Sequence, residues 1–101
     1  MNIEFELGDL KFIWDSEKAK INLKKHKIKF EDAVYVFFDD NRIDEFDELH
    51  SDDEDRYKII GKVANILTVV YTERDDRTRI ISARRATKQE EADYYGQFAY
   101  V

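Results

Sequence analysis

The sequence predicts a small α+β domain in which an antiparallel sheet, a meander of three to four strands, packs against two N-terminal helices and a C-terminal helix. Three observations support this fold class. Three strand-like segments follow one another between short polar turns, two segments with apolar residues at helical spacing precede them, and a capping box opens a final helix. One sheet covered by helices is the natural architecture for this order of elements.

Length and composition place the chain in one folded domain. Its 101 residues correspond to a single domain, and 43% of them are hydrophobic, which suffices for a packed core. Residues 1–9 are expected to be a loosely attached leader, because their alternation is weak and Gly8-Asp9 is typical of a turn. Residues 10–101 are therefore expected to form the domain itself.

The segment after the leader is expected to form a strand and two helices. Residues 10–14 alternate as a short strand, and either Asp15 or Ser16 can cap the helix that follows. Residues 24–26 are Lys, Lys and His, whose positive charge suits the C-terminal end of that helix. Residues 30–38 carry apolar side chains at helical spacing and predict the second helix.

The C-terminal half predicts the sheet and the last helix. A short strand is expected near Ile43, and longer strands are expected at residues 56–63, 66–73 and 79–85. Turns at residues 64–65 and 75–77 would make neighbouring strands antiparallel. Thr87 and Glu90 form the capping box, and the helix after it is expected to pack through Ala92, Tyr95, Phe98 and Ala99.

Charge is segregated along the chain. The net charge of −6 by itself argues against a nucleic-acid binder. The acidic segment, which we define as residues 39–55, has ten acidic residues and one basic residue. By contrast, residues 18–29 contain six Lys and no acid, and residues 77–88 contain four Arg, one Lys and no acid. The average charge therefore hides two basic surfaces.

Composition disfavours several classes of site. Without Cys the chain has no disulfide, thiolate metal site or thiol nucleophile. The two His residues follow no zinc-binding spacing, and residues 52–55 lack the spaced ligands and central Gly of a calcium loop, so neither a metal nor another cofactor is expected. The longest apolar run, residues 66–71, is too short to cross a bilayer, and we expect a cytoplasmic protein without a membrane partner.

The strand at residues 79–85 is the first candidate for a functional surface. Strict alternation places Arg79 and Arg85 on one face and Arg84 on the other, so at least one Arg lies at a margin of the sheet. An Arg there can bind phosphate through two parallel hydrogen bonds and stabilise charge that develops on the phosphate oxygens. From the residues alone, it is at least as reasonable that these Arg side chains neutralise the acidic segment.

Cationic residues of neighbouring strands can join this Arg cluster. Arg56 and Lys58 share one face of the first long strand, and Arg74 ends the second, so these groups can approach Arg84 or Arg85. Such a cluster is typical of a phosphate site, and also of a solvated sheet edge that discourages pairing.

The sequence has two histidines, His26 and His50. Histidine is the side chain that most often transfers protons near neutral pH. His26 is placed to cap the first helix at its C-terminal end, and His50 lies in a polar loop. Each therefore has a structural alternative to a catalytic role.

An ordered set of short segments resembles one protein family. The segments run from the first predicted strand to the last helix and comprise Phe12–Asp15, Asn22–Leu23, Lys25–His26, Phe30–Ala33, His50–Ser51, Glu54, Arg56, Ile60–Gly61, Val69–Arg74, Arg79–Thr87 and, more loosely, Glu90–Tyr95. In this order they resemble the BrnT family of toxins. Three departures are that Lys27 stands where the family often has Gly, that residues 1–9 are an extra leader, and that residues 40–48 are acidic where the family's loop is more apolar.

Membership of the family would imply a ribonuclease toxin with a RelE-like fold, in a bacterial type II toxin–antitoxin pair that inhibits translation. The resemblance also implies a BrnA-like antitoxin with a ribbon-helix-helix DNA-binding part. The toxin would then contact DNA only through the antitoxin complex, which represses its own operon.

The leading hypothesis is metal-independent RNA cleavage, in which a base activates the 2′-OH, cations hold the developing charge on phosphate, and an acid protonates the leaving oxygen. The residues proposed for charge stabilisation are Arg56, Arg74 and Arg84. Those proposed as acid or base are Glu54, His50 and His26, and Glu54 can alternatively serve to orient Arg56. Additional RNA contacts are expected from Arg79, Arg85, Lys25 and Lys58.

Two other functions fit the same sequence. A non-catalytic protein-binding module would act only in complex with its partner, with the acidic segment as its docking surface for a basic peptide. An RNA-binding domain would show salt-dependent affinity without cleavage.

Overall fold

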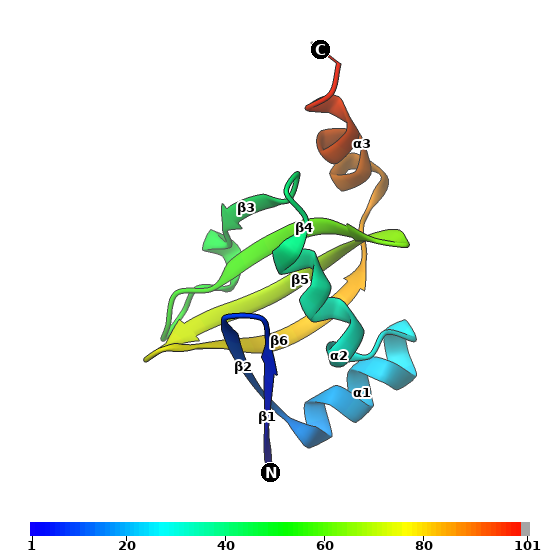
Figure 1. Cartoon of the computed structure of the whole chain (residues 1–101). Helices are drawn as coiled ribbons and strands as arrows, with labels where there is room; N and C mark the ends of the chain where they lie inside the picture. The colour runs from blue at the N-terminus through cyan, green and yellow to red at the C-terminus, as the bar shows by residue number, and fades with distance from the viewer. Residues whose placement is uncertain (100–101) are drawn as a thin grey trace.

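The structure, a computed structural model, describes residues 1–99 (Figure 1). One six-stranded mixed sheet has the order β1-β2-β6-β5-β4-β3, and only β2 and β6 run parallel. Its strands are β1 (Asn2–Leu7), β2 (Leu10–Asp15), β3 (Ile43–Phe46), β4 (Tyr57–Val63), β5 (Asn65–Arg74) and β6 (Arg77–Arg85). The helices are α1 (Ser16–His26), α2 (Phe30–Ala33) and α3 (Lys88–Gly96), with 3-10 helices η1 (Val34–Phe38) and η2 (Glu48–His50).

The α+β class with two N-terminal helices and one C-terminal helix is confirmed. The predicted antiparallel meander is present as β3-β4-β5-β6. The sheet is larger than predicted, because β1 and β2 extend it beyond β6 to six strands. Within the described part of the chain, no helix is long and apolar enough to span a membrane.

Residues 2–7 form the edge strand β1 of the sheet. β1 pairs with β2 along its whole length, from Asn2 opposite Asp15 to Leu7 opposite Leu10. The ring of Phe5 also lies 5.6 Å from that of Trp14 in the core. The division into a leader at residues 1–9 and a domain at residues 10–101 remains a prediction.

Short-range chemistry sets the ends of α1 and α3. The Asp15 side chain caps α1 by accepting a hydrogen bond from the Lys18 amide. Lys27 ends that helix in the left-handed region at φ 61°, ψ 29°, the position where Gly is usual. The predicted capping box of Thr87 and Glu90 is present in α3.

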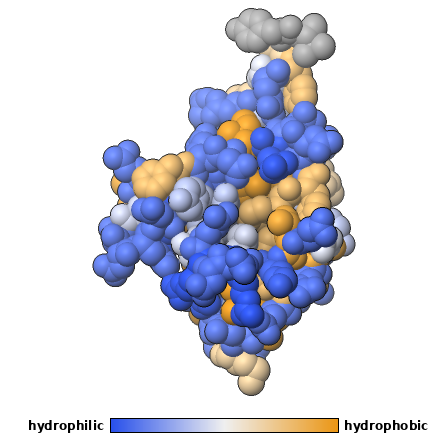
Figure 2. All heavy atoms as spheres, turned by 60° about the vertical axis from the view of Figure 1, so that its left-hand side comes forward, coloured by the Kyte–Doolittle hydropathy of each residue, from blue (hydrophilic) through white to orange (hydrophobic). Residues whose placement is uncertain are grey.

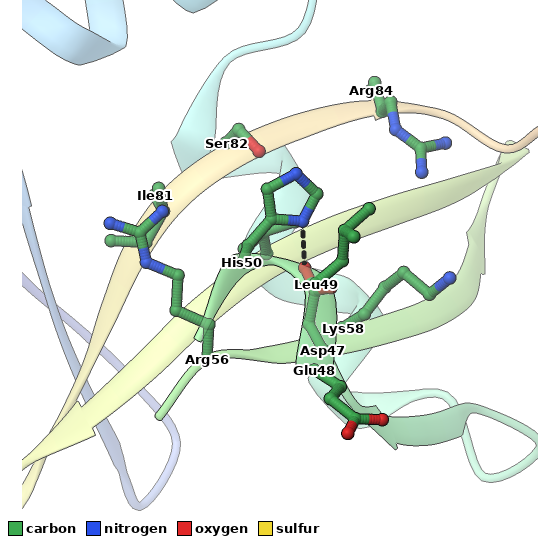
Figure 3. A pocket seen from close by; sticks show the side chains of 10 residues that line it. Asp47, Glu48, Leu49, His50, Arg56, Lys58, Ile81, Ser82 and Arg84 are labelled. Carbon is green, nitrogen blue, oxygen red and sulfur yellow. Dashed lines mark hydrogen bonds and ion pairs between the residues drawn. The ribbon is translucent and has the colours of Figure 1, made fainter. Parts of the chain in front are cut away.

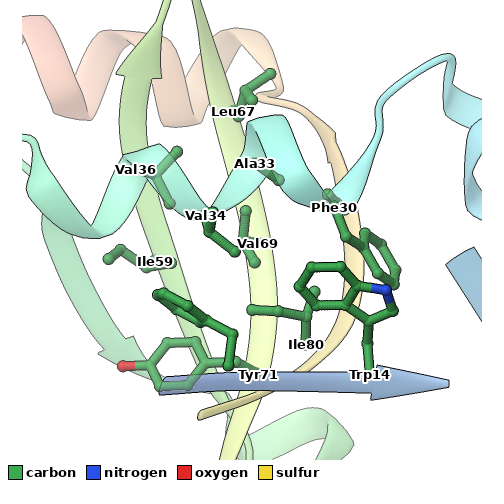
Figure 4. Packing of buried hydrophobic residues seen from close by; sticks show 12 residues of the cluster. Trp14, Phe30, Ala33, Val34, Val36, Ile59, Leu67, Val69, Tyr71 and Ile80 are labelled. Atoms are coloured by element: carbon green, nitrogen blue, oxygen red, sulfur yellow. The ribbon is translucent and has the colours of Figure 1, made fainter. Parts of the chain in front are cut away.

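The covered face of the sheet is the one that α2 and η1 cross (Figure 4). Its core is apolar and fully buried, and Gly61 lets η1 approach β4 closely, because a Cβ there would lie 2.9 Å from that of Val36. The core residues are Phe12, Trp14, Phe30, Ala33, Val34, Val36, Ile59, Leu67, Val69, Tyr71, Ile80 and Ala83.

The open face is the opposite side of β4, β5 and β6, and α3 packs on it at one end. Tyr94 is buried there against Ile60 and Ile66. The predicted packing of α3 through Tyr95 and Phe98 is therefore wrong, since these side chains are 48% and 42% exposed. Hydrophilic residues dominate the side of the molecule shown in Figure 2, with smaller apolar patches between them.

Candidate functional site

A hollow of about 600 Å³ lies on the open face of the sheet (Figure 3). We call it the sheet hollow. Arg56 and Arg84 approach it from opposite ends, and His50 and Leu49 lie between them. Its lining comes from the loop and η2 (Asp47, Glu48, Leu49, His50), from Arg56 and Lys58, from Val70 on β5, and from Ile81, Ser82 and Arg84 on β6.

A β-bulge in β6 decides which Arg side chains share this face. The register with β5 skips Ile81, because Tyr71 lies opposite Ile80 and Val70 lies opposite Ser82. The bulge shifts the alternation by one residue. Arg79 and Arg84 therefore lie on the same face, opposite Thr72 and Thr68, and the prediction that they face opposite sides is wrong.

Arg84 is held in place by Glu90, the capping-box residue of α3. Its two terminal nitrogens donate to the two Glu90 oxygens at 2.7 and 3.1 Å. The same carboxylate accepts hydrogen bonds from the Thr68 hydroxyl at 3.0 Å and from the Thr87 amide at 2.8 Å, and the Lys58 ammonium lies 3.3 Å from it. One buried anion thus fixes two cations of the sheet hollow and the start of a helix.

Electrostatics keep Glu90 ionised. Burial by itself raises the pKa of a carboxyl group, but the hydrogen bonds from Arg84 and from the Thr87 amide outweigh it and lower the pKa of Glu90 to about 2. Since Glu90 stays charged at neutral pH, Arg84 keeps a permanent anionic partner beneath the site.

Arg56 and His50 are positioned by the loop that precedes β4. The Ser51 hydroxyl accepts a hydrogen bond from the Arg56 amide at 2.9 Å and donates to the Asp47 carbonyl at 2.7 Å. His50 Nδ1 lies 2.9 Å from an Asp47 carboxylate oxygen, which orients the imidazole ring. Within residues 1–99 the Arg56 guanidinium has no ion pair, and it remains available for an anionic ligand.

A second hollow adjoins the first and shares His50 and Arg56 with it. Here the Arg74 guanidinium donates to Glu54 at 2.7 Å. This hydrogen bond, opposed in part by desolvation, lowers the pKa of Glu54, so its carboxylate is ionised. Among the described residues, no group of three or more His, Asp and Glu side chains is placed to hold a metal ion.

The remaining predicted site residues lie outside the sheet hollow. Arg79 is half-buried on the same face but does not line it, and Arg85 points to Asn65, whose side-chain oxygen lies 2.9 Å away. His26 and Lys25 lie at the C-terminal end of α1 and line a different groove.

Two features of the site were missed from the sequence. Glu90 was assigned only to the helix cap, and its ion pair with Arg84 depends on how the chain turns between β6 and α3. The bulge at Ile81 was missed as well, because strict alternation gives no sign of an inserted residue. A usable signal for the pair was the apolar neighbourhood of Arg84, which requires a partner for a half-buried charge.

Comparison with known proteins gives a match to a family model and matches to solved structures. The family model described as "Ribonuclease toxin, BrnT, of type II toxin-antitoxin system" matches residues 14–90. Among solved structures, the chain is similar to the 1.1 Å crystal structure of the ribonuclease toxin BrnT from Brucella abortus. The identity is 25%, the TM-score is 0.59, and the match covers 76% of this chain and 96% of that one. No curated protein matches the chain.

Proposed function

Because the chain belongs to the BrnT family of ribonuclease toxins of type II toxin–antitoxin systems, we propose that it cleaves RNA, without a metal ion, in the sheet hollow. A base removes the proton of a 2′-OH, and that oxygen attacks the adjacent phosphorus. The bond to the 5′-oxygen breaks, and an acid protonates the departing oxygen. The products are a cyclic phosphate and a 5′-hydroxyl end.

The observation that carries this proposal is the set of three cations around one hollow, Arg56, Lys58 and Arg84. A phosphate under attack gains negative charge on its oxygens, and preorganised cations stabilise that charge without reorganising during the reaction. Arg56 presents a planar fork for bidentate contact, while Arg84, whose terminal nitrogens donate to Glu90, and Lys58 add positive charge.

We assign proton transfer to His50 and Glu54. His50 lines the hollow and is oriented by Asp47. Glu54 is the second proton-transfer candidate. It lies in the adjoining hollow, where the hydrogen bond from Arg74 keeps its carboxylate ionised. An ionised carboxylate can accept a proton, so Glu54 is better suited to act as the base than as the acid. Arg74 thus contributes by orienting Glu54 and by adding positive charge.

The test compares RNA cleavage by the Arg56→Ala, Arg84→Ala and Arg85→Ala variants. Loss of one charge-stabilising donor lowers the rate by about 10²-fold or more, so Arg56→Ala and Arg84→Ala should be strongly impaired. Arg85→Ala is the matched control, because it removes the neighbouring Arg of the same strand, which is directed at Asn65. Undiminished cleavage by both test variants would falsify the assignment.

Toxicity and its neutralisation form the second part of the proposal. A BrnA-like ribbon-helix-helix antitoxin would bind the toxin and carry the complex to DNA, and the fold would be RelE-like. Expression of the chain alone should arrest bacterial growth, and co-expression of the antitoxin should restore it. A chain that leaves RNA intact yet binds the antitoxin tightly would instead be a non-catalytic protein-binding module.

A further inference from the structure

The two basic segments of the sequence meet along one edge of β6. Within residues 1–99, β2 pairs with β6 only at Thr78 and Arg79, which leaves the rest of that edge without a strand partner among the described residues. Asn22 of α1 fills the place. Its side-chain amide donates to the Ala83 carbonyl at 2.9 Å, and its oxygen accepts from the Ala83 amide at 3.0 Å. This pair of buried hydrogen bonds fixes α1 against the strand that carries Arg84.

The contact at Asn22 determines which face of α1 lies beside β6. Residues three and four positions away on a helix share a face, so Lys18, Lys25 and His26 lie on the side of Asn22. Together with Ile81 and Ser82 they line a groove of about 200 Å³, which we call the α1 groove.

The α1 groove and the sheet hollow meet at the β-bulge. Ile81 and Ser82 line both, and they are the residues at which the β6 register is irregular. A cationic surface therefore continues from Arg84 across the bulge to α1. Lys18 and Lys25 are separated by seven residues, which corresponds to about 10 Å along the helix axis.

A purely structural role does not account for the placement of these lysines. Lys25 suits the negative C-terminal end of the helix dipole, but Lys18 lies in the first turn, where positive charge is unfavourable. Neither has an ion-pair partner in the described part of the chain, whereas Lys20, on another face, pairs with Glu17 at 3.5 Å. Both are exposed and free to bind an anion.

We propose that the α1 groove carries the single-stranded RNA that extends from the sheet hollow, with Lys18 and Lys25 contacting successive phosphates. The inference rests on the proposed function, because it assigns a path to the substrate of that site. A positively charged groove that tracks the backbone binds single strands without regard to sequence. The α1 groove therefore contributes to the affinity for RNA and to the path that the strand takes, but not to the choice of bases.

The test measures binding of 2′-O-methyl RNA, which lacks the attacking hydroxyl and remains uncleaved. Oligonucleotides of about three and about ten nucleotides are compared by fluorescence anisotropy over a range of salt concentrations. The Lys18→Gln/Lys25→Gln variant should bind the long strand about tenfold or more weakly, with its salt slope reduced by roughly 1.4, about 0.7 for each phosphate contact. The short strand should bind as before.

The matched control is Lys20→Gln/Lys24→Gln, which removes the same charge from the same helix away from the α1 groove. Its affinity for the long strand should change little. Equal losses in the two variants, or no loss in either, would overturn the route. So would a defect confined to antitoxin binding, which would make the groove a protein surface. If the unmodified chain fails to cleave ordinary RNA yet binds through Lys18 and Lys25, the proposed function fails and the route stands.

Discussion

On the covered face, Val69 and Ile80 contact apolar side chains brought by α2, η1 and β2. On the open face of the same two strands, Thr68 and Arg84 both bond to the carboxylate of Glu90. The two faces of one sheet are therefore held by different forces. Apolar burial is non-directional and scales with the area removed from water, whereas the polar network depends on donors and acceptors in fixed positions.

The difference teaches where changes should affect stability and where they should affect function. A core tolerates apolar replacement if volume is kept, but a half-satisfied polar network costs more than an apolar one. Substitutions on the covered face should alter the free energy of unfolding and leave RNA affinity unchanged. Those in the sheet hollow should do the reverse, except at Arg84, because its ion pair with Glu90 contributes to stability as well as to the site.

Trp14→Ala should give the largest effect on stability. Trp14 is 1% exposed and packs on Phe5 and Phe30, so its removal leaves a cavity that costs about 3–5 kcal/mol. Denaturant unfolding measures the loss, and Tyr35→Ala, at a half-exposed aromatic residue, is the control. A Trp14→Ala protein that is folded but has lost affinity for RNA would contradict the prediction that the covered face affects stability alone.

Glu90→Gln should give the next largest loss of stability, and it should also lower RNA cleavage. Gln can still accept the hydrogen bond from the Thr87 amide, but it removes the anion beneath Arg84 and Lys58, and about 1–3 kcal/mol of stability should be lost at neutral pH. RNA cleavage should fall as well, because Arg84 loses its fixed orientation.

The pH dependence of unfolding sharpens this prediction. The folded pKa of Glu90, about 2, lies below its ordinary value of 4.5, so its contribution is fully present above about pH 4.5 and is lost as the pH falls toward 2. In Glu90→Gln that part of the acid destabilisation should disappear. The control variant is Glu91→Gln, which makes the same change at the adjacent, exposed Glu. Identical pH profiles for the unmodified chain and Glu90→Gln would contradict the coupling.

Local patterns predicted the elements of the fold better than their pairing. The strands predicted at residues 56–63 and 66–73 correspond to β4 and β5, and the turn between them was predicted as well. The start of α3 follows from its capping box. β1 was missed because its stability comes from pairing with β2 and from the packing of Phe5 on the core, which no local rule reveals. The parallel pairing of β2 with β6 is likewise a contact distant in sequence.

The candidate site was predictable in its cations but not in its geometry. Arg56, Lys58 and Arg84 were grouped from strand positions, and the structure places all three around one hollow. The face of Arg79 depended on a one-residue bulge, and the orientation of Arg84 depended on an ion pair across a turn. Both are tertiary effects that override periodicity.

Lys27→Gly should give the smallest effect. It tests the contribution of backbone strain to stability at the end of α1, away from both faces of the sheet. A side chain at φ 61° is strained by its Cβ, and Gly removes this strain at the cost of greater freedom in the unfolded chain. The balance favours Gly by about 0.5–1 kcal/mol. Lys29→Gly removes the same charge at an ordinary extended position, φ −83°, and should destabilise by a similar amount. Thermal unfolding of the two variants should therefore shift in opposite directions, and a shift in the same direction would show that charge, not backbone strain, dominates at this helix end.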